Sequence, residues 1–211
     1  MGPKQRRERE KEEVKQRILD VARELFVEQG YEAVSMRKIA ERIEYSPTAI
    51  YLHFQDKEAL LEELCGNDFR ALAREFIVFA QIRDPLERLR ASGMAYVDFA
   101  LSHPQHYRLM FMTPTPQHAH SAENLASRGK IDEDAYAFLR ATMAQAIEEK
   151  RVRPEYKDAD LLAQMAWAPV HGVLALHVAK KMEPEWIEAR PPRETAQALI
   201  DAFIRGITKE A

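Results

Sequence analysis

Hydrophobic residues recur along most of the chain with the three-to-four-residue period of an α-helix. In residues 11–29, Val14, Ile18 and Leu25 share one helical face, and Gly30 follows where a helix would end. No run of four or more residues alternates convincingly as a β-strand does. The pattern therefore predicts an all-α protein.

Capping residues divide the next stretch into short helices. Ser35 is placed to begin a second helix, and Ser46 with Pro47 to begin a third that ends near His53. Asp56 caps a fourth helix, which runs toward Phe79.

Longer and more apolar helices are expected beyond residue 80. The pattern predicts helices over 84–102, from Tyr107 to Met110, and over 131–151, 158–181 with a kink at Pro169, and 193–208. Two Thr-Pro pairs and no period mark 113–130 as an exposed, mobile connection. We divide the chain into an arm (1–10), a helix-turn-helix domain (11–60), a connecting helix (61–80) and a C-terminal domain (81–211).

The composition adds few constraints. The 211 residues are 46% hydrophobic and 31% charged, which excludes collagen-like, disordered and disulfide-rich classes. Cys65 is alone, and no leader precedes the first helix, so we expect a cytoplasmic protein. A net charge of −3 does not by itself indicate nucleic-acid binding.

One segment, residues 161–179, is long enough without charge to raise the question of a membrane span. The segment is interrupted by Pro169, His171, Gly172 and His177. These residues make the free energy of its transfer into lipid unfavourable. We expect no membrane span but a helix buried in the core or in a subunit interface.

Residues 36–54 have helix-turn-helix spacing, with two helices joined by residues 44–46. Ala40 stands where the helices would cross, and the residues expected to form the shared core are Ile39, Ile43, Tyr45 and Ile50.

The second helix of this pair leaves a small, mostly uncharged face outward, made of Ser46, Pro47, Thr48, Tyr51 and Leu52. Such a face fits the major groove of DNA. His53 and Lys57 follow where they would hold a phosphate, and Arg37 opens the preceding helix. The alternative is two packed helices of an ordinary bundle.

The first residues carry a basic arm with acidic residues between its cations, which are Lys4, Arg6, Arg7, Arg9 and Lys11. Two interpretations are open: an arm that follows the DNA backbone or enters a minor groove, and a solvated tail.

Residues 18–64 resemble the DNA-binding domain of TetR-type transcriptional regulators. The resemblance rests on the helix Ser35-x-Arg37-x-Ile39-Ala40 and on the run Tyr51-x-x-Phe54-x-x-Lys57-x-x-Leu60. It implies that Arg37 and Thr48 read bases, while Ser35, Tyr51, His53 and Lys57 hold phosphates. The chain departs from the family at Glu44, where the turn usually has glycine.

The C-terminal region resembles a TetR subclass named for a Trp, His-Gly signature, here Trp167 with His171-Gly172. This implies a helical effector-binding and dimerisation domain. Aromatic, thioether and histidine side chains suit a pocket for a small apolar effector. Those expected to line it are Tyr96, Phe99, His103, Tyr107, Met110, Phe111, Met143, Trp167 and His171. A plain hydrophobic core, with His171 satisfied by a backbone carbonyl, is the alternative.

Apolar residues on the last two helices cover more than one packing face, which predicts a homodimer. The interface residues expected are Leu174, Val178, Leu199, Ile200, Phe203, Ile204 and Ile207.

No HExxH, C-x-x-C, G-x-S-x-G or glycine-rich phosphate loop is present, so we expect no enzyme, metal or cofactor. His118 with His120, and His103 with His106, are weak metal candidates. The predicted function is a homodimeric DNA-binding regulator. It would be a repressor that a small apolar effector releases from a palindromic operator. The alternative is a helical homodimer that serves as an interaction module without binding DNA.

Overall fold

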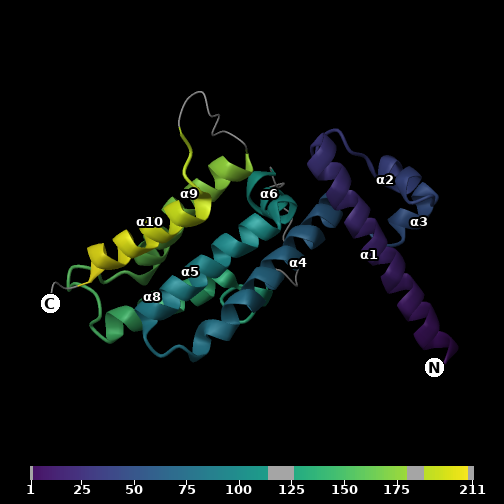
Figure 1. Cartoon of the computed structure of the whole chain (residues 1–211). Helices are drawn as coiled ribbons and strands as arrows, with labels where there is room; N and C mark the ends of the chain where they lie inside the picture. The colour runs from purple at the N-terminus through teal and green to yellow at the C-terminus, as the bar shows by residue number, and fades with distance from the viewer. Residues whose placement is uncertain (1, 114–125, 180–187, 209–211) are drawn as a thin grey trace. The chain divides into compact units, whose positions relative to one another are not determined.

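The computed structural model describes residues 2–113, 126–179 and 188–208 (Figure 1). Every named element in these ranges is helical, which confirms the predicted all-α class. Most of the predicted connection over 113–130, including His118 and His120, lies outside the described residues. The fold divides into two compact units, which we treat separately.

The first unit contains α1 (Pro3–Gln29), α2 (Met36–Arg42), α3 (Pro47–Tyr51) and α4 (Lys57–Ile77) up to Asn67. Most of α6 (Pro104–Met112) also belongs to it, and the Cys65 thiol contacts the Leu109 carbonyl oxygen at 3.6 Å. The sequence pattern places everything after residue 80 in one C-terminal domain. Most of α6 contacts the first unit, and the domain boundary near residue 80 stays a prediction.

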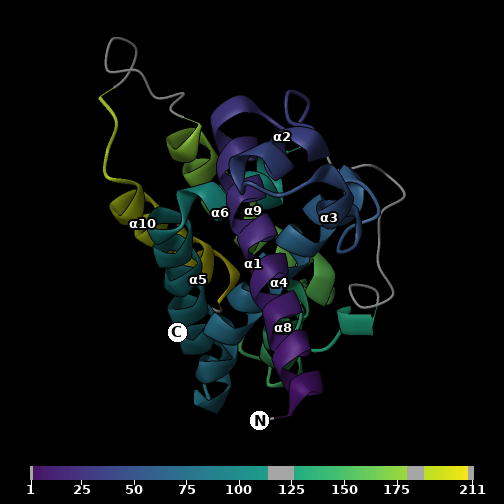
Figure 2. The same ribbon diagram turned by 90° about the vertical axis from the view of Figure 1, so that its right-hand side faces the viewer.

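Helix α2 packs on α1 and α3 packs on α2, and the predicted hydrophobic residues of all three helices share one core (Figure 2). Ile39, Ala40 and Ile50 have no exposed surface, and Ile43 has 1%. The expectation for Tyr45 was wrong. Its side chain is 40% exposed because it lies in the turn, where a large ring projects into solvent.

The turn between α2 and α3 places Glu44 at φ 62°, in the left-handed region. The Tyr45 N–H donates to the Ala40 carbonyl at 2.9 Å and closes the end of α2 around this residue. A Cβ at this φ is strained, which explains why glycine suits the position. The departure noted in the sequence therefore falls on the one residue of the turn where it has a conformational cost.

The predicted arm over residues 1–10 is not an extended segment. Helix α1 begins at Pro3, eight residues before the expected start at Lys11, and its first turns project beyond α2 and α3 (Figure 1). Hydrophobic periodicity could not reveal these turns because they bury nothing. Alternating Arg and Glu residues extend the helix instead, with ion pairs such as Arg6–Glu10 at 2.7 Å.

The second unit is a bundle formed by the rest of α4, the 3₁₀ helix η1 (Val78–Gln81), α5 (Pro85–Ser102), α8 (Ala135–Glu148), α9 (Ala159–Val178) and α10 (Pro192–Ile207). Helix α5 is its centre and contacts α8, α9 and α10. The buried Arg88 fastens α5 to α8 by donating to Thr142 Oγ1 at 3.2 Å, and it also donates to the Ile82 carbonyl.

Helix α9 continues through Pro169 and is shorter than predicted, ending at Val178. Helix α8 starts at Ala135 rather than near residue 131, because Asp134 caps it through the N–H groups of Tyr136 and Ala137. Among the described helices, α9 is long and apolar enough to cross a membrane by length and composition. Only 28% of its apolar window is buried inside the chain.

We predict that Glu44→Gly raises the free energy of unfolding by about 0.5–1 kcal/mol, because it removes the left-handed strain. Urea denaturation followed by far-ultraviolet circular dichroism measures this. Glu44→Gln is the control, since it removes the charge and keeps the strain, and it should leave stability within about 0.3 kcal/mol of the wild type. Equal stabilisation by the two changes would show that charge, not backbone conformation, sets the cost.

Candidate DNA-binding interface and ligand site

The outward face of α3 is exposed as the sequence predicted. Ser46, Pro47 and Thr48 are all exposed, and the side chains of Tyr51 and Leu52 retain 54% and 73% of their surface. A five-residue helix cannot hold itself together in water. The burial of Ile50 therefore fixes α3, and its opposite face is left free for a partner.

Two serine hydroxyls cap the helices of this pair. The Lys38 N–H donates to Ser35 Oγ at 3.2 Å, and the Ala49 N–H donates to Ser46 Oγ at 3.3 Å. Each hydroxyl oxygen satisfies an amide of the first helical turn. Because each oxygen acts as the acceptor in these bonds, each hydroxyl proton can still be donated to an oxygen of a partner.

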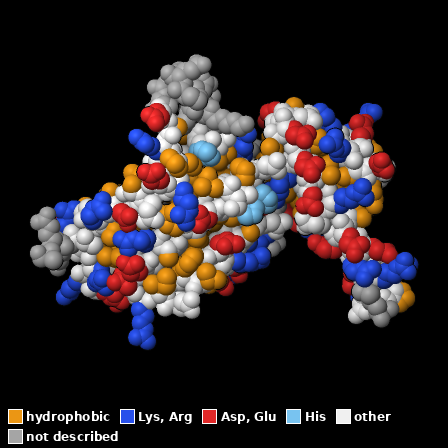
Figure 3. Space-filling model, in the orientation of Figure 1, with side chains coloured by type: hydrophobic (Ala, Val, Ile, Leu, Met, Phe, Trp, Pro, Cys, Tyr) orange, Lys and Arg blue, Asp and Glu red, His pale blue; other side chains and the backbone are white. Residues whose placement is uncertain are grey.

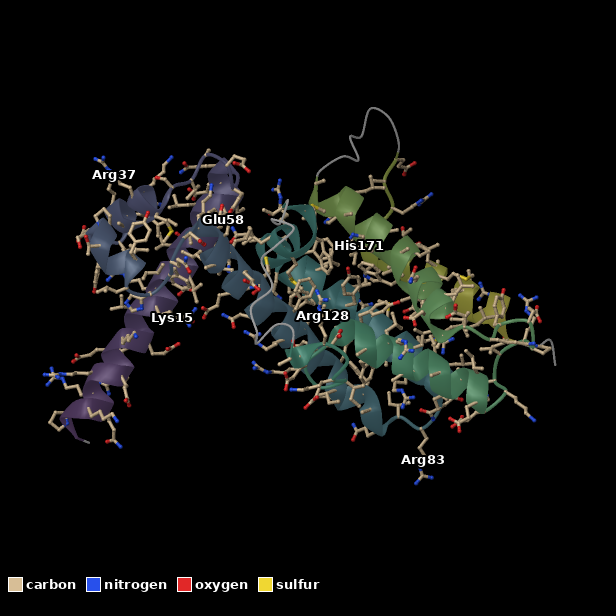
Figure 4. The ribbon with its side chains drawn as sticks, turned by 180° about the vertical axis from the view of Figure 1, so that it is seen from behind. Lys15, Arg37, Glu58, Arg83, Arg128 and His171 are labelled. Atoms are coloured by element: carbon tan, nitrogen blue, oxygen red, sulfur yellow. The ribbon has the colours of Figure 1, made fainter. Side chains whose placement is uncertain are left out.

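Arg37 lies at the start of α2 with 80% of its side chain exposed, and it pairs with Glu41 at 2.9 Å (Figure 4). An ion pair this exposed is worth little. The guanidinium can therefore be redirected to a base or phosphate at small cost.

Lys57 is already engaged inside the first unit. Its ammonium donates to the Tyr31 carbonyl oxygen at 2.9 Å and lies 4.1 Å from the centre of the Tyr31 ring. The first turn of α4 is occupied too, because the Ala59 N–H donates to Asp56 Oδ1 at 2.7 Å. The phosphate clamp predicted at this terminus is thus filled by the chain's own groups, and Lys57 ties the turn after α1 to α4.

His53 follows α3 and is half-buried, with its Nδ1 atom lacking a hydrogen-bond partner among the described residues. Burial lowers the pKa of its imidazole, and the nearby cations Lys11 and Lys15 lower it further. The acidic Glu12 of α1 acts in the opposite direction, and the net lowering of the pKa favours the neutral ring.

In the second unit, three of the predicted effector-site residues form one polar cluster between α5 and α9. Trp167 Nε1 donates to the Tyr96 hydroxyl at 3.2 Å, and that hydroxyl lies 2.9 Å from His171 Nδ1. Since an indole can only donate, the tyrosine oxygen accepts from it, and the direction of the bond to Nδ1 depends on which nitrogen of the neutral imidazole carries the proton. Burial lowers the pKa of His171, which favours this neutral form.

The other predicted effector-site residues are divided between the two units. Phe99 lies on α5 against the exposed His103, with ring centres 5.2 Å apart. Met143 is fully buried in the core of the second unit. Three more, Tyr107, Met110 and Phe111, lie on α6 in the first unit.

An open groove runs along α10, and none of the predicted effector residues lines it. Its walls are Pro191, Arg193, Glu194, Gln197, Ala198 and Asp201. One wall residue, Arg193, is ion-paired with Asp98 at 2.9 Å.

Most residues predicted for the dimer interface are covered by the chain itself. Leu174, Val178, Ile200, Ile204 and Ile207 are at most 7% exposed within this chain, and only Leu199 and Phe203 are half-buried. The sequence pattern identified apolar faces on α9 and α10 but could not tell which face meets the neighbouring helices.

A different face of α9 is exposed, and the sequence reasoning missed it. Leu161, Met165 and Leu176 are 51%, 37% and 47% exposed, with Ala168 and Pro169 exposed between them. Their spacing puts all five on one side of the helix, which we call the α9 stripe. The signal was present in the sequence, because this helix is apolar all round and a single chain cannot cover every side of it.

We predict that Tyr96→Phe lowers the free energy of unfolding by about 1–3 kcal/mol, because it removes the hydroxyl that Trp167 and His171 both contact in a buried place. Urea denaturation at pH 7.5 measures the loss. The matched control is Tyr136→Phe, whose hydroxyl donates to Asp160 at 3.1 Å on the surface and should cost less than about 0.5 kcal/mol. Equal losses would contradict a stabilising role for the buried cluster.

Two family models match this chain. The model described as bacterial regulatory proteins of the TetR family matches residues 18–64. The model described as a tetracyclin repressor-like C-terminal domain matches residues 89–203, more than half of the chain. The helix-turn-helix and the C-terminal bundle thus each fall in a matched region. The finer resemblance to the Trp, His-Gly subclass is not confirmed.

Known regulators match over part of this chain. The transcriptional regulator UidR of Escherichia coli K12 is 39% identical over 84 residues, which are 39% of this chain and 37% of UidR. The transcriptional activator FasR of Mycolicibacterium smegmatis is 33% identical over 102 residues, 48% of this chain and 47% of FasR. The matched part is therefore less than half the length of either relative.

Solved structures match over nearly the whole chain. The TetR family regulator PfmR from Thermus thermophilus is 26% identical with a TM-score of 0.65, covering 91% of this chain and 99% of PfmR. The fatty acid degradation regulator FadR from Bacillus halodurans has a TM-score of 0.71 over 98% of this chain and 97% of FadR, and at 17% identity it supports the fold alone. With both family models matched and the α3 face exposed, the chain belongs to the TetR family of bacterial transcriptional regulators.

Proposed function

We propose that this chain is a cytoplasmic homodimeric repressor that binds a palindromic DNA operator through α3 and leaves it when a small apolar effector binds the second unit. The observation that carries the DNA contact is the face of Thr48, Tyr51 and Leu52, which is exposed on a helix held from behind by Ile50. Family membership favours DNA binding over an interaction module without it.

The residues proposed to touch DNA fall into two groups. Thr48 and Arg37 carry donors and a methyl group suited to base edges, while Ser35, Ser46 and Tyr51 carry hydroxyls suited to phosphates. Pro47 and Leu52 would add apolar contacts. Because Lys57 is bound to Tyr31, its contribution would be to hold the turn in place or to share one remaining proton with a phosphate.

The proposed effector site centres on the cluster of Tyr96, Trp167 and His171. This cluster offers a hydroxyl and two ring nitrogens among apolar helices, which is how a mostly apolar site orients a ligand. It also links α5 to α9. A ligand that replaced one of these hydrogen bonds would favour a different spacing of the two helices and so a different equilibrium between DNA-binding states.

The dimer proposal is supported by the α9 stripe. Large apolar side chains on one side of a single helix are costly to leave in water, and a second copy packed on the same stripe would cover both. Half-buried Leu199 and Phe203 on α10 would add to such an interface. A dimer would present two copies of α3 about one DNA turn (~34 Å) or a multiple apart.

The DNA proposal is tested by selecting duplexes from a random library with the full chain and measuring affinity by gel shift. Tyr51→Ala should weaken binding to the selected duplex by about tenfold or more, because its exposed ring and hydroxyl would lose a phosphate contact. Tyr136→Ala, on the surface of the second unit, should bind like the wild type. Failure to select any sequence, or equal binding by both variants, would contradict the proposal.

For the dimer, Met165→Glu combined with Leu176→Glu should convert the protein to a folded monomer, since two charges per chain would be buried without partners. Light scattering after gel filtration gives the mass, and circular dichroism checks the helix content. The control is Gln164→Glu beside the stripe, which should stay dimeric. A monomeric wild type, or a dimeric double variant, would rule out this interface.

A further inference from the structure

The first three turns of α1 carry two chemically different faces. Both arginines Arg6 and Arg9 are held by glutamates four residues ahead, with Arg6–Glu10 at 2.7 Å and Arg9–Glu13 at 3.2 Å. The side chains of Lys4, Arg7 and Lys11 form no ion pair or hydrogen bond with any other described residue. We call these three cations, which are all exposed, the basic stripe.

The basic stripe continues the buried face of α1. Lys4, Lys11, Ile18 and Leu25 are spaced seven residues apart, and this spacing returns to nearly the same side of a helix. Ile18 and Leu25 are 0% and 2% exposed because α2, α3 and α4 cover them. Where the helix projects beyond its neighbours, this spacing places Lys4 and Lys11 on that side, and the projecting turns as a whole carry both basic and acidic side chains (Figure 3).

The inner end of the basic stripe lies close to the proposed DNA contacts. Lys11 acts electrostatically on His53, the residue two positions after α3. Lys15, next on the same side, lies 5.9 Å from the centre of the Phe54 ring (Figure 4). Lys15 is paired with Glu63, and Glu12 also acts on His53, so Lys11 is the cation of the basic stripe that lies near the end of α3 without an ion pair.

The chemistry of the stripe fits a phosphate backbone. Seven residues of helix place Lys4 and Lys11 about 10 Å apart, so the stripe can reach more than one phosphate of a closely charged duplex backbone. Residues 4–13 contain no hydrophobic side chain, so this part of α1 has no apolar face with which to enter a lipid surface.

We propose that Lys4, Arg7 and Lys11 form a second DNA contact, in which the helical arm of α1 holds backbone phosphates of the duplex that α3 reads. This inference rests on the proposed function and adds a contact outside the helix-turn-helix. Because it involves phosphates only, it strengthens binding to every sequence and selects none.

The test compares two double variants that remove the same charge from the two faces of the arm. The variant Arg7→Gln with Lys11→Gln removes two of the three cations of the basic stripe. The control, Arg6→Gln with Arg9→Gln, removes two cations that are already ion-paired with glutamates. Affinity of the full chain is measured by fluorescence anisotropy at several salt concentrations. The probes are a duplex selected by the wild type and an unrelated duplex of equal length, and circular dichroism confirms that both variants keep their helix content.

The stripe variant should bind both duplexes about tenfold more weakly at roughly 0.1 M salt, and the slope of log K against log salt should fall by about 2 or more. The control variant should stay within about twofold of the wild type in affinity and keep its slope. Equal effects of the two variants, or none from the stripe variant, would overturn the inference.

The same assay separates this inference from the proposed function. If Tyr51→Ala weakens binding while the stripe variant binds like the wild type, the inference fails and the proposed function stands. If the wild type shows neither a preferred duplex nor salt-dependent binding to any duplex, the inference and the proposed function are both wrong.

Discussion

The packing of α3 on α2 and α1 is the constraint on which the rest of the molecule depends. A helix of five residues is stable only while Ile50 is buried against Ile39 and Ile43, and Ala40 lets the two helices approach. The same packing decides which side of α3 faces outward. Burying one face of a short helix thus leaves the opposite face as a recognition face. Any change that loosens this core would also leave the outward side chains of α3 less firmly positioned.

Polar contacts within the first unit serve that core more than they serve a ligand. Lys57, Tyr31 and Glu58 connect the turn after α1 to α4, with the Tyr31 hydroxyl donating to Glu58 at 3.0 Å. Burial and Glu58 together raise the pKa of Tyr31 above its usual value, so the hydroxyl stays protonated and keeps donating. A residue type common in phosphate binding is here a structural link, while the free cations lie elsewhere, along the arm of α1.

The sequence was sufficient for features that depend on local periodicity and capping. The helical class, the caps at Ser35 and Ser46 and the exposed face of α3 follow from short-range patterns, and the structure confirms them. It was insufficient where burial depends on distant segments. Tyr45 is exposed, Met143 is in the core, and Leu174 faces the chain's own helices, because periodicity reports that a face is apolar and not what covers it.

Hydrogen–deuterium exchange of the full chain, with and without a selected duplex, tests the account most directly. If α3 reads DNA, amides between Ser46 and His53 exchange quickly in the free protein, because so short a helix opens easily, and become protected in the complex. Protection confined to the second unit, or an unchanged rate at α3 in a saturated complex, would contradict the central claim.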